Sequence, residues 1–515
     1  MGLARTRSVA LLGVEGHDVE IEAHLGDGPA GLTLVGLPDT ALREARDRIR
    51  AAILNSGEHW PEEHITVSLS PASLPKRGSG FDLGIAAAVL GASGALPVEA
   101  VYDSVLLAEL GLDGRTRPVR GVLPAVLAAV RTGRSRFVVA RSNAAEARLV
   151  PDIEVLPVGS LGEFLARLRG DPEPGLDDAD TPEDADELAV PADDSGGARR
   201  PDLADVLGQP VARRAVEIAA AGGHNLFLLG PPGTGKSLLA ERLPTVLPPL
   251  TMSESIEATA IHSVAGTLPR GKPLVTEPPF CDPHHTATRA AVIGGGSSQL
   301  RPGSVSLAHR GVLFLDEAPE FARGVLDSLR QPLESGEVVV ARAAATVRFP
   351  ARFLLVMAAN PCPCGKPGRG CVCPSVARRR YLTRLSGPLL DRVDLKVELQ
   401  PVSRAELLAD RSFAESSETV AARVREARRR AARRLAGTPW GSNAEIPGAE
   451  LRRRFPVPGE ALRLLASALD RGEISARGVD RVLRTSWTIA DLAGRSMPTP
   501  EDTGYAFALW AGAAP

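Results

Sequence analysis

The sequence predicts an α/β protein with a buried parallel sheet, preceded by a further α/β unit and followed by a helical region. Short apolar runs at 225–229, 312–315 and 353–357 are typical of buried parallel strands. Beyond residue 403 such runs stop, and helical periodicity dominates to the end of the chain. Apolar residues make up 44% of the sequence and aromatic residues only 4%, so we expect cores built from Ala, Val and Leu.

The chain divides into four predicted parts: an α/β domain at 1–170, a linker at 171–200, the α/β core at 201–402 and a helical domain at 403–515. In the first part, apolar runs predict strands at 105–108 and 137–140, and Ala-rich segments predict helices at 83–90 and 123–130. The segment 171–194 contains eleven acidic residues and no basic residue. Because it has few large apolar groups, we expect the linker to be disordered.

The net charge of −2 conceals an uneven distribution. Residues 1–200 carry −11, whereas residues 201–515 carry +9, so a basic module follows the acidic linker. No apolar run reaches the roughly 18 residues that a membrane span needs, and no signal-peptide pattern opens the chain. We therefore expect a cytoplasmic protein that does not contact a membrane.

A phosphate-binding loop follows the first predicted core strand and precedes a helix. Its residues are Gly230, Pro231, Pro232, Gly233, Thr234, Gly235, Lys236 and Ser237. Glycines let backbone N–H groups surround the phosphates, while the lysine reaches the β- and γ-phosphates and the serine binds Mg²⁺. The loop therefore predicts ATP and Mg²⁺ as ligands.

Polar residues end the next two predicted strands. Asp316 follows the run 312–315, at the strand end where ligands bind in open α/β sheets, so we expect it to hold Mg²⁺. Glu317 is placed to polarise the attacking water. Asn360 ends the following strand, where it either hydrogen-bonds the γ-phosphate or the water, or forms an Asx turn before Pro361.

Four cysteines cluster on one short loop rich in Pro and Gly: Cys362, Cys364, Cys371 and Cys373. Four thiolates match a tetrahedral Zn²⁺ site, although the Cys-x-Cys spacing is tighter than the usual Cys-x-x-Cys. Structural zinc and redox-sensitive free thiols are the two interpretations. The loop follows Asn360, and a metal at this position would stiffen an interface between subunits.

Arginine-rich segments indicate contact with the phosphate backbone of DNA. Seven arginines fall within twelve residues of a predicted helix at 423–434, and from them we select Arg425, Arg428, Arg429 and Arg433. The alternative is a solvated helix that faces the acidic linker. A second patch comprises Arg378, Arg379 and Arg380, and a predicted hairpin at 337–349 carries Arg342 and Arg348.

Together, the phosphate loop, the Asp-Glu strand end, the strand-terminal Asn and the helical end resemble the AAA+ ATPases. Longer motifs resemble the ComM/YifB family of magnesium-chelatase-like proteins over essentially the whole chain. These motifs are Pro-His-His-Thr from Pro283, Gly-Gly-Gly from Gly294, the run from Ser306 to Glu317, Asn-Pro-Cys-Pro-Cys-Gly from Asn360 and Ser-Gly-Pro-Leu-Leu-Asp-Arg from Ser386. The chain departs from the family at Cys281-Asp282 and at Ser304.

The resemblance implies roles for three residues. Asn360 matches the first sensor, Arg392 the arginine finger that reaches a neighbouring subunit's ATP, and Arg477 the second sensor on a helical lid. Arg384 is the competing finger candidate. The family resemblance also implies a homo-oligomeric, hexameric ring. In such a ring, an arginine supplied by the neighbouring subunit links ATP hydrolysis to assembly.

In the N-terminal part, the segments 74–82 and 117–123 resemble the Lon-protease fold. That family uses a Ser–Lys dyad, but the serine position falls on Gly80 and the lysine position on Leu123. Ser79 lies one residue away, yet no lysine occurs between residues 77 and 235. A serine without its base is a weak nucleophile, so we expect a Lon-like domain that serves assembly or partner binding.

The function expected from the resemblance is an ATP-driven ring motor on single-stranded or branched DNA. Its activity would be that of a helicase or branch-migration factor in homologous recombination or natural transformation. Two alternatives remain: an ATPase subunit that drives Mg²⁺ insertion into a porphyrin, and an ATP-dependent protease. The missing lysine disfavours the protease.

Overall fold

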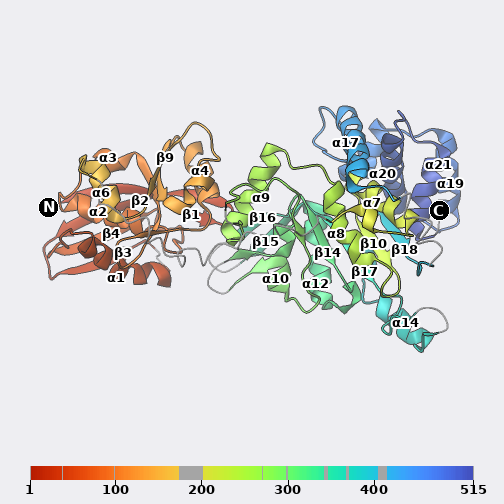
Figure 1. Ribbon diagram of the computed structural model, residues 1–515, viewed down its shortest axis with the longest axis horizontal. Coiled ribbons are helices and arrows are strands. Elements are labelled where there is room, and N and C mark those ends of the chain that lie inside the picture. Colours follow the sequence, from red (N-terminus) through yellow and green to blue (C-terminus); the bar gives the residue numbers. More distant parts are fainter. Residues whose placement is uncertain are drawn as a thin grey trace.

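The computed structural model describes residues 2–36, 39–97, 99–172, 201–269, 271–296, 300–341, 346–366, 370–403 and 414–513. Most of the predicted linker, residues 173–200, lies outside this range, as does Arg342 in the predicted hairpin turn. Figure 1 shows two α/β units along the long axis of the molecule, with a group of helices beside the second. None of the helices in the described part is long and apolar enough to cross a membrane.

The N-terminal unit is built on a seven-stranded mixed sheet with the order β3-β4-β2-β1-β5-β8-β9. Its strands are β1 (Leu3–Leu12), β2 (Glu15–Gly26), β3 (Gly31–Val35), β4 (His64–Ser70), β5 (Ser104–Leu107), β8 (Arg136–Ala140) and β9 (Glu154–Val158). A small separate pair comprises β6 (Glu109–Leu110) and β7 (Thr116–Arg117). The helices are α1 (Thr40–Asn55), α2 (Asp82–Ala92), α3 (Glu99–Tyr102), α4 (Val122–Arg131), α5 (Ala144–Ala147) and α6 (Leu161–Arg169). Every residue of α2 is buried, as its continuous apolar sequence predicts.

The second unit contains a five-stranded parallel sheet with the order β11-β14-β17-β10-β18. Its strands are β11 (Phe280–Cys281), β14 (Val312–Leu315), β17 (Leu354–Ala359), β10 (Leu226–Leu229) and β18 (Leu395–Glu398). β14 and β17 are buried throughout, because helices cover both faces of such a sheet. The predicted strands at 225–229, 312–315 and 353–357 therefore match observed neighbours within this sheet.

Helices and two hairpins complete the second unit. The helices are α7 (Pro210–Gly222), α8 (Lys236–Val246), α9 (Met252–Ala265), α10 (Arg289–Ile293), α11 (Ser304–Leu307), α12 (Arg323–Ser328), α13 (Arg330–Ser335), α14 (Ser375–Leu382) and α15 (Gly387–Leu390). The hairpins pair β12 (Gly294–Gly295) with β13 (Arg301–Pro302), and β15 (Glu337–Ala341) with β16 (Thr346–Pro350). The second hairpin is the one predicted at 337–349.

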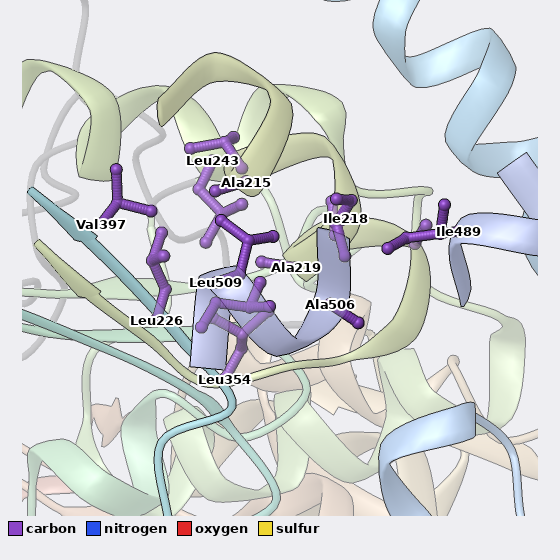
Figure 2. Packing of buried hydrophobic residues seen from close by; sticks show 14 of the residues in the cluster. Ala215, Ile218, Ala219, Leu226, Leu243, Leu354, Val397, Ile489, Ala506 and Leu509 are labelled. Carbon is purple, nitrogen blue, oxygen red and sulfur yellow. The ribbon is translucent and has the colours of Figure 1, made fainter. Parts of the chain in front are cut away.

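The C-terminal region is helical, as expected. It comprises α17 (Ser417–Arg434), α18 (Gly448–Arg454), α19 (Gly459–Asp470), α20 (Ala476–Leu492) and α21 (Pro500–Ala511). Figure 2 shows how it joins the sheet: Ile489 of α20 and Leu509 of α21 pack in one cluster with Leu226 of β10. A single apolar core therefore fixes the helical region against the sheet and α7.

The two α/β units also contact each other through α4 and α9. Ala260 of α9 joins the apolar cluster around Val122 and Val126. Beside it, Ser263 donates a hydrogen bond to the buried carboxylate of Glu146 and accepts one from the Gly121 N–H at 3.0 Å. Burial raises the pKa of Glu146. The contact thus couples a buried carboxylate of the first unit to a helix of the second.

The two units also come close together at the turn between β1 and β2, where the close contact requires glycine. Gly13, in the turn between β1 and β2, has φ +68°, and a Cβ added there would lie 2.4 Å from Cγ1 of Val347 on β16. The first unit therefore lies directly against the β15–β16 hairpin.

Candidate nucleotide site

The phosphate loop connects β10 to α8 with Gly233 and Gly235 in the left-handed region, at φ +79° and +90°. A Cβ at either glycine would meet no atom within 4 Å, so the inside of the loop is open. Lys236 begins α8 and folds back into the loop. Its Nζ donates to the carbonyl oxygens of Gly230 at 2.7 Å and Pro231 at 2.9 Å.

The lysine also bridges to the next strand, because its Nζ donates to Oδ1 of Asn360 at 3.1 Å. Burial lowers the pKa of Lys236, and the nearby carboxylates of Asp316 and Glu317 oppose that shift. Asn360 and Lys236 thus meet at the carboxyl edge of the sheet. The sequence predicted that Lys236 reaches the phosphates and left Asn360 as a contact of the γ-phosphate or the water, or as part of an Asx turn.

Ser237 and Asp316 are also brought together. The serine Oγ donates to Oδ2 of Asp316 at 2.7 Å, and the Glu317 N–H donates to Oδ1 of Asp316 at 2.8 Å. A hydroxyl and a carboxylate oxygen at this separation are the ligands that Mg²⁺ takes from proteins beside a nucleotide. The residues present therefore fit the predicted metal.

Glu317 has an unusual backbone conformation and a partner that the sequence did not reveal. Its φ is +49°, a left-handed conformation that is costly outside glycine and is concentrated at functional sites. Nδ1 of His285 lies 3.4 Å from its Oε2. The rings of His284 and His285 pack with centroids 4.1 Å apart. Sequence reasoning assigned these histidines no chemistry; their position after β11, the strand beside β14, was the available signal.

The four clustered cysteines meet at one point. The Sγ atom of Cys362 lies 3.4 Å from that of Cys364 and 3.5 Å from that of Cys371, and all four sulfurs lie within 4.8 Å of one another. A tetrahedral zinc with Zn–S bonds of about 2.3 Å separates its sulfurs by about 3.8 Å, so the set fits Zn²⁺. The backbone N–H of Lys366 lowers the pKa of the Cys364 thiol, whereas burial raises the pKa of the Cys362 thiol beside it.

The cysteine loop backs onto the phosphate loop. Gly365 has φ +64°, and a Cβ there would lie 2.7 Å from Cγ of Pro232. Tyr381 of α14 is buried beside Asn360, and burial raises its pKa to about 12. The segment that follows β17 is therefore packed against the nucleotide site.

Arg392 and Arg477 lie at the opposite edge of the sheet. Both line a cavity of about 720 Å³ bounded by residues that precede the strands, including Asn225, Gly311 and Phe353. Because the strands are parallel, this amino edge faces away from the phosphate loop. Arg392 pairs with Glu334 and donates to the Pro388 carbonyl, while its Nε is buried without a hydrogen-bond partner.

Arg384, the competing finger candidate, lies elsewhere. Its Nη1 donates to Oε2 of Glu320 at 2.8 Å and to the Pro319 carbonyl at 3.3 Å. Glu320 follows Glu317 by three residues, so Arg384 sits at the carboxyl edge of its own chain. The structure thus separates the two candidates by placing them at different edges.

The arginines of α17 divide into an inner and an outer set. Arg428 donates through Nε and Nη2 to the Ala220 carbonyl at 2.9 and 2.7 Å and lines the 720 Å³ cavity. We therefore withdraw it as a DNA contact, because its guanidinium is held within the fold. Arg425, Arg429 and Arg433 are exposed at spacings of four and form one stripe, which we call the outer stripe.

The other DNA candidates lie on the surface. Arg378, Arg379 and Arg380 are exposed on α14, which Figure 1 shows at one corner of the core. Arg348 of β16 is exposed and pairs with Glu337 at 3.2 Å. Arg342 lies outside the described residues.

The segments of the first unit whose sequence resembles the Lon-protease fold make contacts within the unit. Ser79 hydrogen-bonds the Glu109 carboxylate, and buried Asp82 pairs with Arg48 at 3.0 Å. The N–H of Leu123, the lysine position, donates to Glu146 at the contact between the units. Lys76 is fully buried and donates to the Pro71 carbonyl, and burial lowers its pKa.

Comparison with known protein families finds magnesium-chelatase models in three parts of the chain. Residues 202–407 match the family described as magnesium chelatase, subunit ChlI, residues 21–143 match subunit ChlI of Mg-chelatase, and residues 414–509 match its C-terminal model. The protein Rv2897c of Mycobacterium tuberculosis is 50% identical over 510 residues, which cover 99% of each chain. Competence protein ComM of Haemophilus influenzae is 42% identical over 498 residues, or 96% of this chain and 94% of that protein. YifB of Escherichia coli is 41% identical over 494 residues, with the same shares.

Proposed function

Because the chain belongs to the ComM/YifB family of magnesium-chelatase-like proteins, we propose that it is a ring-forming AAA+ ATPase that uses ATP hydrolysis to move on DNA. Lys236 and the loop backbone bind the phosphates, and Ser237 and Asp316 hold Mg²⁺. Mg²⁺ supplies charge neutralisation at the β- and γ-phosphates. Glu317 orients the attacking water, and Asn360 contacts the water or the γ-phosphate.

The observation that carries the ring proposal is the separation between the two edges of the sheet. Arg392 and Arg477 line the cavity at the amino edge, whereas Lys236 and Asp316 lie at the carboxyl edge. An arginine stabilises the charge of phosphoryl transfer only when it touches the phosphates. With Arg392 as the finger, a second copy must present its cavity to the first copy's nucleotide, and head-to-tail repetition of that contact gives a ring when the rotation between copies closes. The family resemblance suggests six copies.

The outer stripe supports DNA as the substrate of the motor. Arg425, Arg429 and Arg433 point away from the packed face of α17, and Arg348 and Arg378–Arg380 add exposed positive charge. Contacts of this kind bind the phosphate backbone without reading bases, as a translocating motor requires. The name of the relative ComM suggests a role in competence, so we place the activity in recombination during natural transformation, as helicase or branch migration.

We propose Zn²⁺ as a structural ion in the cysteine cluster. Its sulfur geometry fits the metal, and the loop lies against Pro232. A zinc-filled loop would hold the phosphate loop and Asn360 in place. Metal analysis of the purified protein tests this assignment, and one zinc per chain is expected.

The two alternatives receive less support. A chelatase subunit shares the ATPase core, but the relatives that match the whole chain include ComM and YifB. Protease activity requires a base for a serine, whereas Ser79 is bound to Glu109 and Lys76 to a backbone carbonyl.

The test is an ATPase assay on the full chain with and without single-stranded or branched DNA at moderate salt. We expect DNA to bind and to stimulate hydrolysis. If neither DNA binds nor changes the turnover, the DNA motor proposal fails, and a porphyrin substrate is the next to assay.

A further inference from the structure

The cavity at the amino edge contains half-buried arginines that form no ion pair with a carboxylate among the described residues. Nε of Arg484, on α20, is buried without a hydrogen-bond partner, and no ion pair is found for its guanidinium within the described residues. Arg428 reaches only the neutral carbonyl of Ala220. Burial lowers the pKa of both guanidinium groups.

The carboxylates that face Arg484 are already paired. Asp394 is buried, accepts a hydrogen bond from Arg481 and lies 3.7 Å from His224. Asp480 pairs with Arg452 on α18. Arg484 therefore shares these two carboxylates with Arg481 and Arg452 and forms no ion pair of its own among the described residues.

A buried charge without a partner is unfavourable, so buried guanidinium groups normally have an anionic partner. The neighbouring arginines of the cavity follow this rule, since Arg310 pairs with Glu254 at 3.3 Å and Arg392 pairs with Glu334. Arg484 and Arg428, in the same wall, form no such pair among the described residues. An anion from outside the chain would supply the partner that they lack.

We propose that Arg484 binds the phosphates of the nucleotide held by a neighbouring copy, with Arg428 adding positive charge behind it. Arg477, Arg481 and Arg484 are spaced by four and three residues on α20, so they share one helix face toward the cavity. This proposal rests on the proposed ring, because the nucleotide arrives on the neighbour's phosphate loop. It adds a phosphate contact to those of Arg392 and Arg477.

A phosphate anion in this cavity has two sources, the neighbour's bound nucleotide or a free nucleotide. Subunit mixing separates them. Arg484→Ala keeps an intact phosphate loop, whereas Lys236→Ala keeps an intact cavity. In a mixed ring, Arg484 of a Lys236→Ala subunit can contact the nucleotide bound by a neighbouring Arg484→Ala subunit.

We expect Arg484→Ala alone to lower kcat by about 10- to 100-fold while ATP binding is kept, as for loss of one group that stabilises transition-state charge. Mixing it with inactive Lys236→Ala should raise turnover clearly above the sum of the two. Recovery also shows that Arg484→Ala folds and assembles. Arg463→Ala is the matched control, since Arg463 is exposed on α19 outside the cavity and should keep full turnover.

The reference mixture is Arg392→Ala with Lys236→Ala. If that mixture recovers activity but the Arg484→Ala mixture does not, the assignment of Arg484 is overturned while the ring proposal stands. If neither recovers, the ring proposal itself fails. Saturable binding of ADP to Lys236→Ala protein, abolished in the Lys236→Ala/Arg484→Ala double variant, would instead assign the cavity to free nucleotide and overturn the proposal.

Discussion

The two edges of the five-stranded sheet differ in the groups that they carry, and in the proposed ring they would complement each other. The carboxyl edge has an open cradle of glycines, one buried lysine and the carboxylates of Asp316 and Glu317. The amino edge has a cavity lined with arginines but no phosphate loop. The same sheet positions both, because loops that precede and follow its parallel strands emerge on opposite sides. Within one chain, the arginines of the cavity and the phosphate loop therefore lie on opposite sides of the sheet.

The largest expected effect on ATP turnover comes from replacing Arg392 in the cavity at the amino edge. Arg392→Ala should lower kcat by about 10³-fold, within the range known for an arginine supplied in trans, and leave ATP binding at the chain's own loop nearly unchanged. Single-turnover hydrolysis and nucleotide titration measure the two quantities. Arg384→Ala is the matched control; if it causes the larger loss, the finger lies at the carboxyl edge and the two edges are not complementary.

The next effect comes from the carboxyl edge. Glu317→Gln should lower kcat by about 10²-fold or more because the amide no longer polarises the water, while the protein retains ATP. Filter retention of labelled ATP checks the trapped state.

His285→Ala should cause a smaller loss in kcat with KM unchanged, and His285→Asn, which keeps an N–H donor, should recover part of it. Full activity in His285→Ala would show that its contact with Glu317 is incidental.

A third prediction concerns the two faces of α17. Replacing Arg425, Arg429 and Arg433 together with Ala should weaken single-stranded DNA binding by about 10-fold or more and reduce the salt slope by roughly 0.7 for each phosphate that is no longer neutralised. Hydrolysis without DNA should stay at the wild-type level. Replacing Arg453, Arg463 and Arg471 removes the same charge from α18, α19 and the turn after α19; an equal fall in DNA affinity there would mean that only net charge matters.

A further prediction concerns the cysteine cluster, which lies beside the phosphate loop at the carboxyl edge. Removing the proposed Zn²⁺ with a chelator, or changing Cys364 to Ser, should cost several-fold in ATP turnover and lower the Tm, since the loop packs against Pro232. Metal content, turnover and Tm are measured on the same sample. Cys281→Ser is the control, because Cys281 lies outside the cluster. Unchanged turnover after complete metal removal would show that the cluster does not support the nucleotide site.

The smallest effect is expected in the N-terminal unit. Ser79→Ala should leave ATP turnover and ATP binding within about two-fold of wild type, because the serine binds Glu109 and has no lysine partner. Assays with an unfolded protein substrate check for peptidase activity. Cleavage that disappears in Ser79→Ala would restore the protease hypothesis.

Local patterns predicted what lies within one strand–loop–helix unit. The phosphate loop, the Asp-Glu strand end and the hairpin at 337–349 could be read from spacing, because strand ends and glycine turns are set by neighbouring residues. Contacts between distant segments could not. Arg428 looked free in the helix pattern, yet its partner Ala220 is 208 residues away, and His285 meets Glu317 only because β11 lies beside β14. The edge on which Arg392 and Arg477 lie depends on the topology of the whole sheet.

The central claim, that one active site is built from two edges of different copies, is tested most directly by mixing Lys236→Ala and Arg392→Ala subunits. Each variant alone should be nearly inactive. In an equal random mixture about one quarter of the subunit junctions join an intact loop to an intact Arg392, so we predict recovery of about a quarter of wild-type turnover per chain. A mixture that stays as inactive as its components would contradict the claim.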